Sequence, residues 1–173
     1  AKDWTPPRLA VKLSQIRDVI LKERGHLPDM LSLEEVENAN VVKMLAQELG
    51  FTRLAMTDSP DVRGIDVALL FNESRALSCP SYAEYEVRGS FLSGFTRNIL
   101  ELHCRVEGGQ QLIVYANHWP SQAAPPSVRM GVAKFVKQLV DERLGDDPSA
   151  HILLLGDFNV VNTEQPHAIQ TVF

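Results

Sequence analysis

The sequence predicts a single domain of the mixed α/β class with at least one antiparallel pair of strands. Helical periodicity lies near both ends of the chain, and apolar strand-like runs dominate its middle. Two adjacent glycines join two of these runs as a hairpin. No internal repeat or low-complexity linker divides the 173 residues, which is an ordinary length for one domain. This order of elements is typical of sheets packed together with helices.

Composition narrows the class of protein further. Hydrophobic residues make up 45% and charged residues 23%, which excludes a largely disordered chain. No apolar run approaches the roughly 20 residues that span a bilayer, and the first residues show no hydrophobic signal-peptide core. Seventeen basic against 22 acidic residues give a net charge of −5, without the surplus of a non-specific DNA-coating protein. Phosphate chemistry would therefore depend on a metal ion or on a few local bases.

Three helices are predicted. The first begins after Thr5, which can cap it, and ends at Gly25. Its apolar face repeats at spacings of four, three and four residues: Leu9, Leu13, Ile16 and Ile20. The second helix is expected over Val41–Leu49, and the third and longest over Ser127–Leu144. Two prolines in the first turn of the first helix support its start, because proline is tolerated there.

Five strands are predicted from apolar runs or from alternation of apolar and polar residues. They cover Met30–Leu33, Ile65–Phe71, Asn98–Val106, Leu112–Ala116 and Ile152–Leu155. Gly108 and Gly109 lie between the third and fourth strands and predict the hairpin. The last strand is entirely apolar and is expected to be buried. Two cysteines, Cys79 and Cys104, are too few for a disulfide framework, and whether they pair is left open.

Polar side chains lie at the ends of four of these strands. The segments are Glu34-Glu35, Arg63-Gly64-Ile65-Asp66, Asn117-His118 and Gly156-Asp157-Phe158-Asn159. A buried strand ordinarily runs into a turn without such chemistry. Carboxylates, an amide and an imidazole at several strand ends therefore indicate a site held by a rigid sheet.

Asp157 and Asn159 are the first candidates. In an extended segment two residues that are two positions apart point to the same side, so a carboxylate and an amide would face a common ligand. Gly156 would let the backbone turn sharply as it leaves the core. The alternative is an ordinary Asp/Asn turn, because both residues form local hydrogen bonds in turns.

Glu35 and His118 are the other candidates. A carboxylate directly after an apolar strand suits a hard cation such as Mg²⁺, but Glu34, Glu35 and Glu37 could equally be a charged run facing water. His118 could act as an acid, a base or a donor to phosphate, or it could be satisfied by backbone carbonyls near a turn. No His/Cys pair has the spacing of a structural zinc site.

Four motifs together resemble the endonuclease/exonuclease/phosphatase superfamily. In order they are Leu31-Ser32-Leu33-Glu34-Glu35-Val36-Glu37-Asn38, Arg63-Gly64-Ile65-Asp66-Val67-Ala68-Leu69-Leu70, Asn117-His118-Trp119-Pro120-Ser121 and Gly156-Asp157-Phe158-Asn159. The resemblance extends from about Trp4 to Asn159 and is nearest to bacterial members of this group of metal-dependent phosphoesterases. It implies a four-layer α/β/β/α sandwich of the deoxyribonuclease-I-like type, with the site at one edge.

The resemblance also implies a role for each candidate. Glu35 matches the family's Mg²⁺ ligand, with Mn²⁺ or Ca²⁺ as alternative ions. Asp157 matches the residue that orients the attacking water, Asn159 the one that holds the phosphate, and His118 the one that contacts the phosphate or assists the leaving group. Asp66 receives a supporting role near the site. Where the family usually has glutamine before the metal ligand, this chain has glutamate, which adds negative charge.

The implied function is Mg²⁺-dependent hydrolysis of a phosphodiester or phosphomonoester, with nucleic acid or a lipid head group among the possible substrates. Two alternatives stay open: a non-catalytic binding module on the same fold, and an unrelated α/β protein in which these groups are scattered. The resemblance leaves the compartment open between cytoplasm and secretion, and it says nothing of the oligomeric state.

The resemblance also has gaps at both ends. The family begins with a strand that bears an asparagine and ends with a strand followed by Ser-Asp-His, and neither pattern is found in this sequence. We therefore expect residues 1–173 to form one domain that is incomplete at both termini. On this expectation the chain as given is nearly inactive by itself and self-associates through unpaired strand edges.

Overall fold

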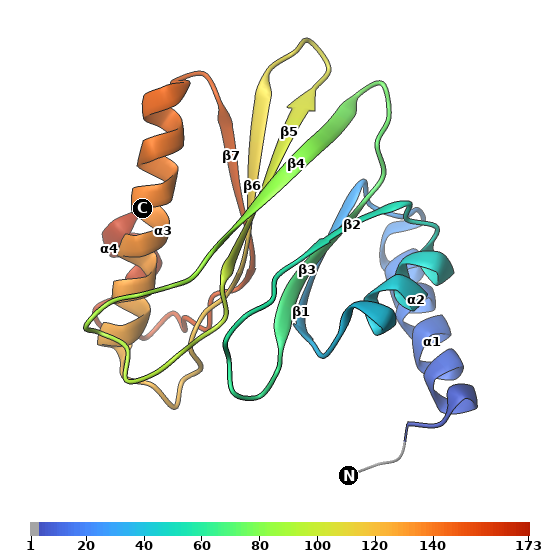
Figure 1. Cartoon of the computed structure of the whole chain (residues 1–173), viewed down its shortest axis with the longest axis horizontal. Coiled ribbons are helices and arrows are strands. Elements are labelled where there is room, and N and C mark those ends of the chain that lie inside the picture. The colour runs from blue at the N-terminus through green and yellow to red at the C-terminus, as the bar shows by residue number, and fades with distance from the viewer. Residues whose placement is uncertain (1–3) are drawn as a thin grey trace.

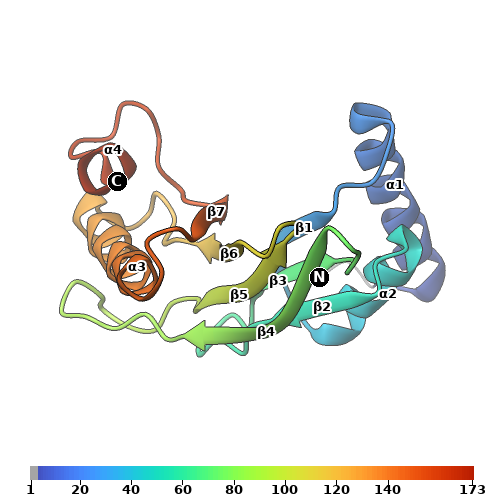
Figure 2. The same cartoon turned by 90° about the horizontal axis from the view of Figure 1, so that it is seen from above.

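The computed structural model, which describes residues 4–173, contains two β-sheets packed face to face with helices on both outer faces (Figure 1). In chain order the elements are α1 (Pro6–Arg24), β1 (Met30–Val36), α2 (Ala39–Leu49), β2 (Arg53–Met56), β3 (Asp66–Phe71), β4 (Leu77–Tyr85), β5 (Ile99–Val106), β6 (Gln111–His118), α3 (Pro126–Asp146), β7 (His151–Asp157) and α4 (Ala168–Val172). Figure 2 shows α1 and α2 on one side of the sandwich and α3 and α4 on the other. The predicted four-layer fold is confirmed.

The smaller sheet has the order β1-β3-β2, with both pairs antiparallel. Its central strand β3 is buried along its whole length. Alternate side chains of β3 face opposite directions, so Val67 and Leu69 enter the core between the sheets while Ala68 and Leu70 pack under α1 and α2. Because both faces of the strand are covered, its sequence is a continuous apolar run, which is why the sequence alone revealed it.

The larger sheet has the order β4-β5-β6-β7. The predicted hairpin between β5 and β6 is confirmed, and its two turn glycines, Gly108 and Gly109, both have positive φ. Strands β6 and β7 are parallel and are connected through α3, the longest helix. In the register of this pair, His118 lies opposite Asp157. The carboxyl ends of two neighbouring parallel strands therefore meet at one edge of the sheet.

Apolar side chains form three layers of core. One layer lies between the two sheets, one lies between the small sheet and α1 and α2, and one lies between the large sheet and α3 and α4. Cys79 of β4 and Cys104 of β5 are buried in the layer between the sheets and form a disulfide bond. The pairing that the sequence left open is thus present in the structure.

Several sequence predictions need correction. Thr5 makes no side-chain hydrogen bond to cap α1, although Gly25 ends that helix in the left-handed conformation as predicted. Strands β2 and β4 and the short helix α4 were missed. Strand β4 carries polar residues and a proline, and it lacks a long apolar run. The predicted buried strand, β7, is an edge strand whose Leu153 is 42% exposed. Within residues 4–173, no helix combines the length and apolarity that crossing a membrane requires.

Candidate active site

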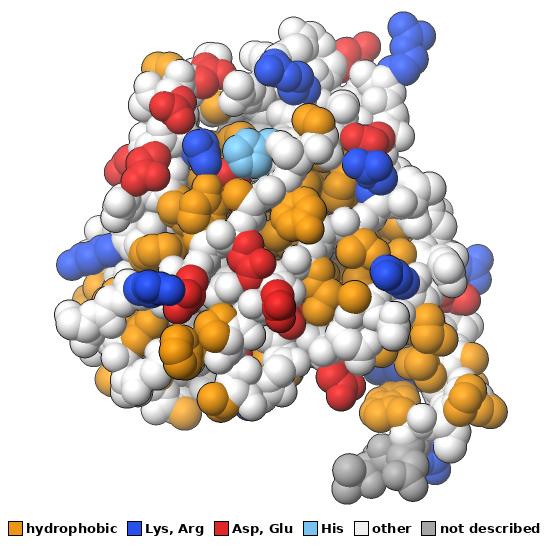
Figure 3. All heavy atoms as spheres, in the orientation of Figure 1, with side chains coloured by type: hydrophobic (Ala, Val, Ile, Leu, Met, Phe, Trp, Pro, Cys, Tyr) orange, Lys and Arg blue, Asp and Glu red, His pale blue; other side chains and the backbone are white. Residues whose placement is uncertain are grey.

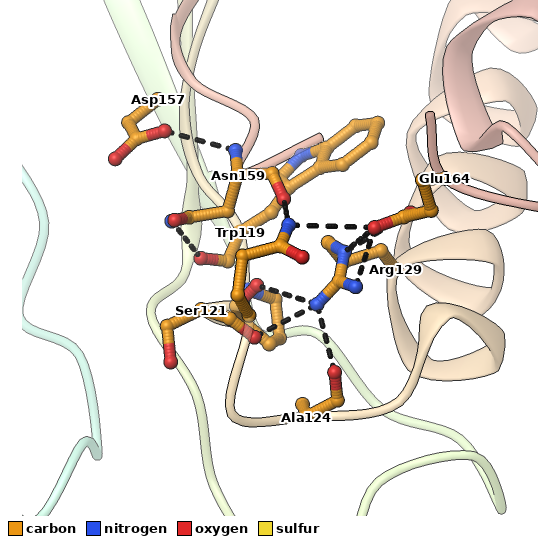
Figure 4. Close-up of polar contacts among 9 residues, drawn as sticks. Trp119, Ser121, Ala124, Arg129, Asp157, Asn159 and Glu164 are labelled. Atoms are coloured by element: carbon orange, nitrogen blue, oxygen red, sulfur yellow. Dashed lines mark hydrogen bonds and ion pairs between the residues drawn. The ribbon is translucent and has the colours of Figure 1, made fainter. Parts of the chain in front are cut away.

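Strand β7 and the turn after it place the first two candidates. The backbone N–H of Trp119, which follows His118, donates to the carbonyl oxygen of Asp157 at 2.9 Å and extends the parallel pairing by one residue. Asn159 then turns back: its backbone N–H donates to Asp157 Oδ1 at 2.9 Å, and its Nδ2 donates to the carbonyl oxygen of Trp119 at 2.9 Å (Figure 4). The expectation of an extended segment through Asn159 is wrong, because β7 ends at Asp157. The turn that was kept as the alternative is what forms.

Glu35 lies in a β-bulge of β1. Leu33 pairs with Ala68 and Val36 with Asp66, so Glu34 and Glu35 together oppose the single residue between those two partners. The expectation that Glu35 follows the strand is corrected, since β1 continues to Val36. A bulge re-aims side chains at the rim of a sheet. It leaves Glu35 exposed and Glu34 half-buried.

Backbone strain is concentrated at two of the predicted site residues. Among residues 4–173, the non-glycine residues with positive φ are Glu35, at 57°, and Asn159, at 51°. Such conformations cost free energy and persist only where the surrounding structure holds them, commonly at functional sites. The strain therefore supports a function at this edge of the sandwich.

Acidic groups of the two sheets approach one another beside this edge. Burial raises the pKa of Glu34, a hydrogen bond of 2.7 Å from Ser32 Oγ opposes the rise, and the charge of Asp157 adds to it. A cavity of about 470 Å³ next to these residues is lined by α1, β1 and β7, including Glu34 and Gly156. Glu34 thus belongs to the same electrostatic environment as Asp157, and it is not simply part of a solvated charged run.

His118 is buried, with 5% of its surface exposed, and its Nδ1 has no hydrogen-bond partner. Burial is the main reason why its pKa lies below the ordinary value; Arg97 lowers it further, while Asp157 and Glu35 oppose the change. The alternative in which backbone carbonyls satisfy this histidine does not hold for Nδ1. Glu35 and Asp157, which come from two other strands, therefore each act electrostatically on His118.

Arg97 and Asp61 are site residues that sequence reasoning missed. Arg97 is buried; its Nη2 donates to the carbonyl oxygen of Trp119 at 2.5 Å, and its Nη1 lies 3.4 Å from Asp61 Oδ2. Asp61 also accepts from Arg63, at 3.2 Å. Arg97 and Asn159 therefore donate to the same carbonyl oxygen, that of Trp119. The negative charge of Glu35 also interacts with the Arg97 guanidinium. The available signal was the polar segment that precedes β5, at the opposite end of that strand from its hairpin.

Buried polar atoms without a partner gather at the same edge. Within the described part of the chain, the buried side-chain atoms that lack a hydrogen bond are Thr96 Oγ1, Arg97 Nε, Asn98 Oδ1, His118 Nδ1 and, elsewhere in the large sheet, Glu101 Oε2. Buried polar groups are nearly always paired, so each exception calls for an explanation. Four exceptions in one neighbourhood are what a binding site for a polar ligand presents.

Asp66, the first residue of β3, supports this edge of the sandwich. Its Oδ1 accepts hydrogen bonds from Thr57 Oγ1 at 2.9 Å and from the backbone N–H of Ser59 at 2.7 Å. Ser59 Oγ in turn accepts from the backbone N–H of Asn98 at 3.0 Å. Asp66 thereby holds the loop between β2 and β3, which also carries Asp61, against the start of β5. The supporting role of Asp66 in the site stays a prediction.

The donor set at this edge fits a hard cation that retains water. In residues 4–173, no group of three or more His, Cys, Asp and Glu side chains could enclose a metal ion. Mg²⁺ does not need such an enclosure, because it is commonly held by one or two carboxylates, several waters and the phosphate of the substrate. Glu35 and Asp157 are the carboxylates whose charges reach His118. Glu35 would hold the ion here, and the identity of the ion stays a prediction.

Replacing Gly156 by alanine should destabilise this edge. Gly156 has φ of 118°, and a Cβ atom there would lie 2.0 Å from the carbonyl oxygen of Asn117. We expect the free energy of unfolding to fall by about 2 kcal/mol, as measured by urea denaturation. Gly145→Ala in α3 is the matched control, because a Cβ atom there meets nothing within 4 Å. Equal stability of the two variants would contradict the close approach of β7 to β6.

A sandwich of two sheets covered by helices, with polar side chains at the strand ends of one edge, defines this chain as a deoxyribonuclease-I-like α/β/β/α domain. The model of the endonuclease/exonuclease/phosphatase family matches residues 1–171, and the chain belongs to this family. None of the curated proteins compared with the chain matches it.

Solved structures show the same fold. Truncated TDP2 from Caenorhabditis elegans is 18% identical with a TM-score of 0.70, over 91% of this chain and 58% of that one. The human Nocturnin catalytic domain with bound sulfate is 18% identical with a TM-score of 0.69, over 89% and 59%. ANGEL2, a 2′,3′-cyclic phosphatase in complex with adenosine-2′,3′-vanadate, is 16% identical with a TM-score of 0.69, over 88% and 44%. The chain therefore spans about half the length of these structures.

Proposed function

We propose that this domain hydrolyses a phosphate ester, a phosphodiester or a phosphomonoester, with Mg²⁺ as its cofactor. The observation that carries the proposal is the pair of partnerless buried atoms, Arg97 Nε and His118 Nδ1, on two residues that interact electrostatically with Glu35. Donors of both Arg97 and His118 suit a phosphate, and carboxylates suit a cation that binds the same phosphate. Sulfate is bound in the Nocturnin structure and adenosine-2′,3′-vanadate in the ANGEL2 structure, and both are oxyanions chemically related to phosphate.

Asp157 would orient the attacking water. Its Oδ1 accepts the backbone N–H of Asn159, which holds the carboxylate in one orientation and leaves its other oxygen to accept a hydrogen bond from water. Asn159 uses its Nδ2 to donate to Trp119, but an amide nitrogen has two N–H groups, and the second can donate to the phosphate. The turn after β7 thus supplies both functions from one rigid segment.

His118 would donate to a phosphate oxygen or to the leaving group. Because its pKa is lowered, chiefly by burial, the imidazole is neutral at neutral pH, with a donor on one nitrogen and an acceptor on the other. Arg97 lies beside it as a permanent positive charge. A bound Mg²⁺ would polarise the phosphate and stabilise the negative charge that develops in the transition state.

The substrate is proposed only as a class, a phosphate ester with nucleic acid or a lipid head group as its possible alcohol part. On the face of the molecule drawn in Figure 3, acidic and basic side chains are intermixed among the described residues, without one broad basic patch. Together with the net charge of −5, this disfavours recognition that depends mainly on a long polyanionic backbone. A small or locally bound phosphate ester fits the site better.

The second candidate function is a binding module of the same fold without catalysis. The observation in its favour is that the partnerless buried atoms of Arg97 and His118 could bind a phosphate ester whether or not it is then hydrolysed. Such a module would bind a phosphate ester and release it unchanged.

The test measures turnover of bis(4-nitrophenyl) phosphate by the complete gene product in about 5 mM MgCl₂, the millimolar order at which hydrated Mg²⁺ sites fill. We expect hydrolysis that EDTA abolishes and that excess Mg²⁺ restores. Binding of vanadate, followed by calorimetry, without any turnover of diesters or monoesters would support the binding module instead. Turnover that is unchanged by EDTA would contradict the metal assignment.

A further inference from the structure

Arg129 is a buried cation that the proposed chemistry does not use. It lies in α3 with 1% of its surface exposed. Its Nη1 donates to the carbonyl oxygens of Ser121 at 2.8 Å, Ala124 at 3.0 Å and Pro120 at 3.4 Å. These three carbonyls belong to the loop that leaves β6 directly after His118 and Trp119. One side of the guanidinium therefore holds the first loop of the site (Figure 4).

The other side of the guanidinium holds the second loop. Arg129 Nε lies 3.1 Å and 3.0 Å from the two carboxylate oxygens of Glu164, and its Nη2 lies 2.5 Å from Oε2. Glu164 is buried, and the hydrogen bonds from Arg129 are the main reason why its pKa is lowered. Glu164 follows Asn159 in the loop between β7 and α4. Both loops of the site are thus tied to one side chain of one helix.

Gln122 joins this ion pair to Asn159 itself. Its Nε2 donates to the backbone carbonyl oxygen of Asn159 and lies 3.3 Å from Glu164 Oε2. Asn159 has positive φ, a conformation that the surrounding structure must hold. Gln122 restrains the Asn159 carbonyl, while the Trp119 carbonyl restrains its side chain. Both contacts therefore restrain Asn159, the residue of the turn that has positive φ.

We propose that Arg129, Glu164 and Gln122 form a positioning clamp that sets the geometry of Asn159 and of the Trp119 carbonyl relative to His118. Its consequence for catalysis rests on the proposed phosphoesterase function, whereas its effect on the two loops does not. None of the three residues is among those proposed to act on the phosphate. A small misplacement of groups that orient a phosphate lowers the rate strongly, because the reacting geometry is narrow.

The experiment compares Gln122→Ala, Glu164→Gln and Arg129→Lys in the complete gene product. Gln122→Ala removes the link to Asn159 and leaves the ion pair. Glu164→Gln keeps the shape of the side chain but removes its charge, and Arg129→Lys keeps the charge but loses the planar fork that reaches the loop carbonyls. Asp141→Asn is the matched control, because it breaks an ion pair with Lys137 on the exposed face of the same helix.

Three measurements are made on each variant. Hydrogen exchange followed by mass spectrometry reports the protection of residues 119–124 and 158–164. Steady-state hydrolysis of bis(4-nitrophenyl) phosphate with Mg²⁺ reports kcat and KM separately. Melting temperature is recorded so that a variant that fails to fold is recognised, and Gln122→Ala, whose side chain is exposed, keeps the test decisive if the buried variants unfold.

We expect faster exchange in both loops, with the rest of the large sheet protected as before. We expect kcat to fall by about 10-fold in Gln122→Ala and about 100-fold in Glu164→Gln, with KM within about threefold of the wild type and with Arg129→Lys retaining more activity than Glu164→Gln. Unchanged exchange in both loops would overturn the clamp whether or not the chain is an enzyme. If the loops exchange faster in the variants and the wild type hydrolyses no phosphate ester, the clamp is upheld and the proposed function is contradicted.

Discussion

Glu35→Gln is expected to lower Mg²⁺-dependent hydrolysis by about 10³-fold while the protein stays folded. Glutamine keeps the size of the side chain and one acceptor oxygen, but it lacks the negative charge that a hard cation requires. Loss of the ion removes several kcal/mol of transition-state stabilisation, and about 4 kcal/mol corresponds to this factor. Initial rates across a Mg²⁺ titration measure the effect. Part of the loss should be recovered at high Mg²⁺ if the variant still binds the ion weakly.

Glu37→Gln is the matched control for that experiment. Glu37 belongs to the same acidic stretch and is exposed, but it lies beyond the end of β1. It should retain wild-type kcat and wild-type dependence on Mg²⁺. Wild-type rates in Glu35→Gln, or equal losses in the two variants, would contradict the assignment of Glu35 as the metal ligand and return it to the solvated charged run.

His118→Ala is expected to lower kcat by about 10²-fold or more, with little change in KM. A donor to the phosphate or the leaving group contributes most as charge develops, so the loss falls on turnover. Its Nδ1 has no partner in the protein, so the substitution leaves no protein group unpaired there, and we expect little change in melting temperature. His151→Ala is the control, because that exposed histidine lies at the other end of the neighbouring strand β7. A destabilised variant with normal kcat would assign His118 a structural role.

The stability of the protein should also report the titration of His118. The pKa of His118 in the folded state lies below its value in the unfolded state. As the pH falls below about 6.5, the unfolded state therefore takes up a proton at this histidine before the folded state does, and the folded state loses stability. Stability from the neutral imidazole is therefore present above that pH and is lost on acidification towards the folded-state pKa. His118→Ala lacks this term, so its free energy of unfolding should fall less between pH 7.5 and pH 5 than that of the wild type, as urea denaturation can measure.

The sequence predicted those elements whose local signals agree with their burial. The apolar run of β3 is continuous because the strand is covered on both faces, and the hairpin after β5 follows from Gly108 and Gly109. Gly25 and Gly50 end their helices in the left-handed conformation, as their positions after apolar helical repeats indicated. The polar segments at strand ends were also visible, and in the structure Glu35 and Asp157 each act electrostatically on His118. Their roles in catalysis stay predictions.

Only the tertiary structure decided how these elements form a site. The exposure of β7 depends on its place at the edge of a sheet, which an apolar sequence does not reveal. The bulge at Glu35 arises from the register of β1 against β3, and Arg97 meets Asp61 across 36 positions of sequence. Arg129 likewise reaches Glu164 across 35 positions. Periodicity reports which face of an element is buried, but pairings between distant segments depend on packing and on the cost of burying a charge without a partner.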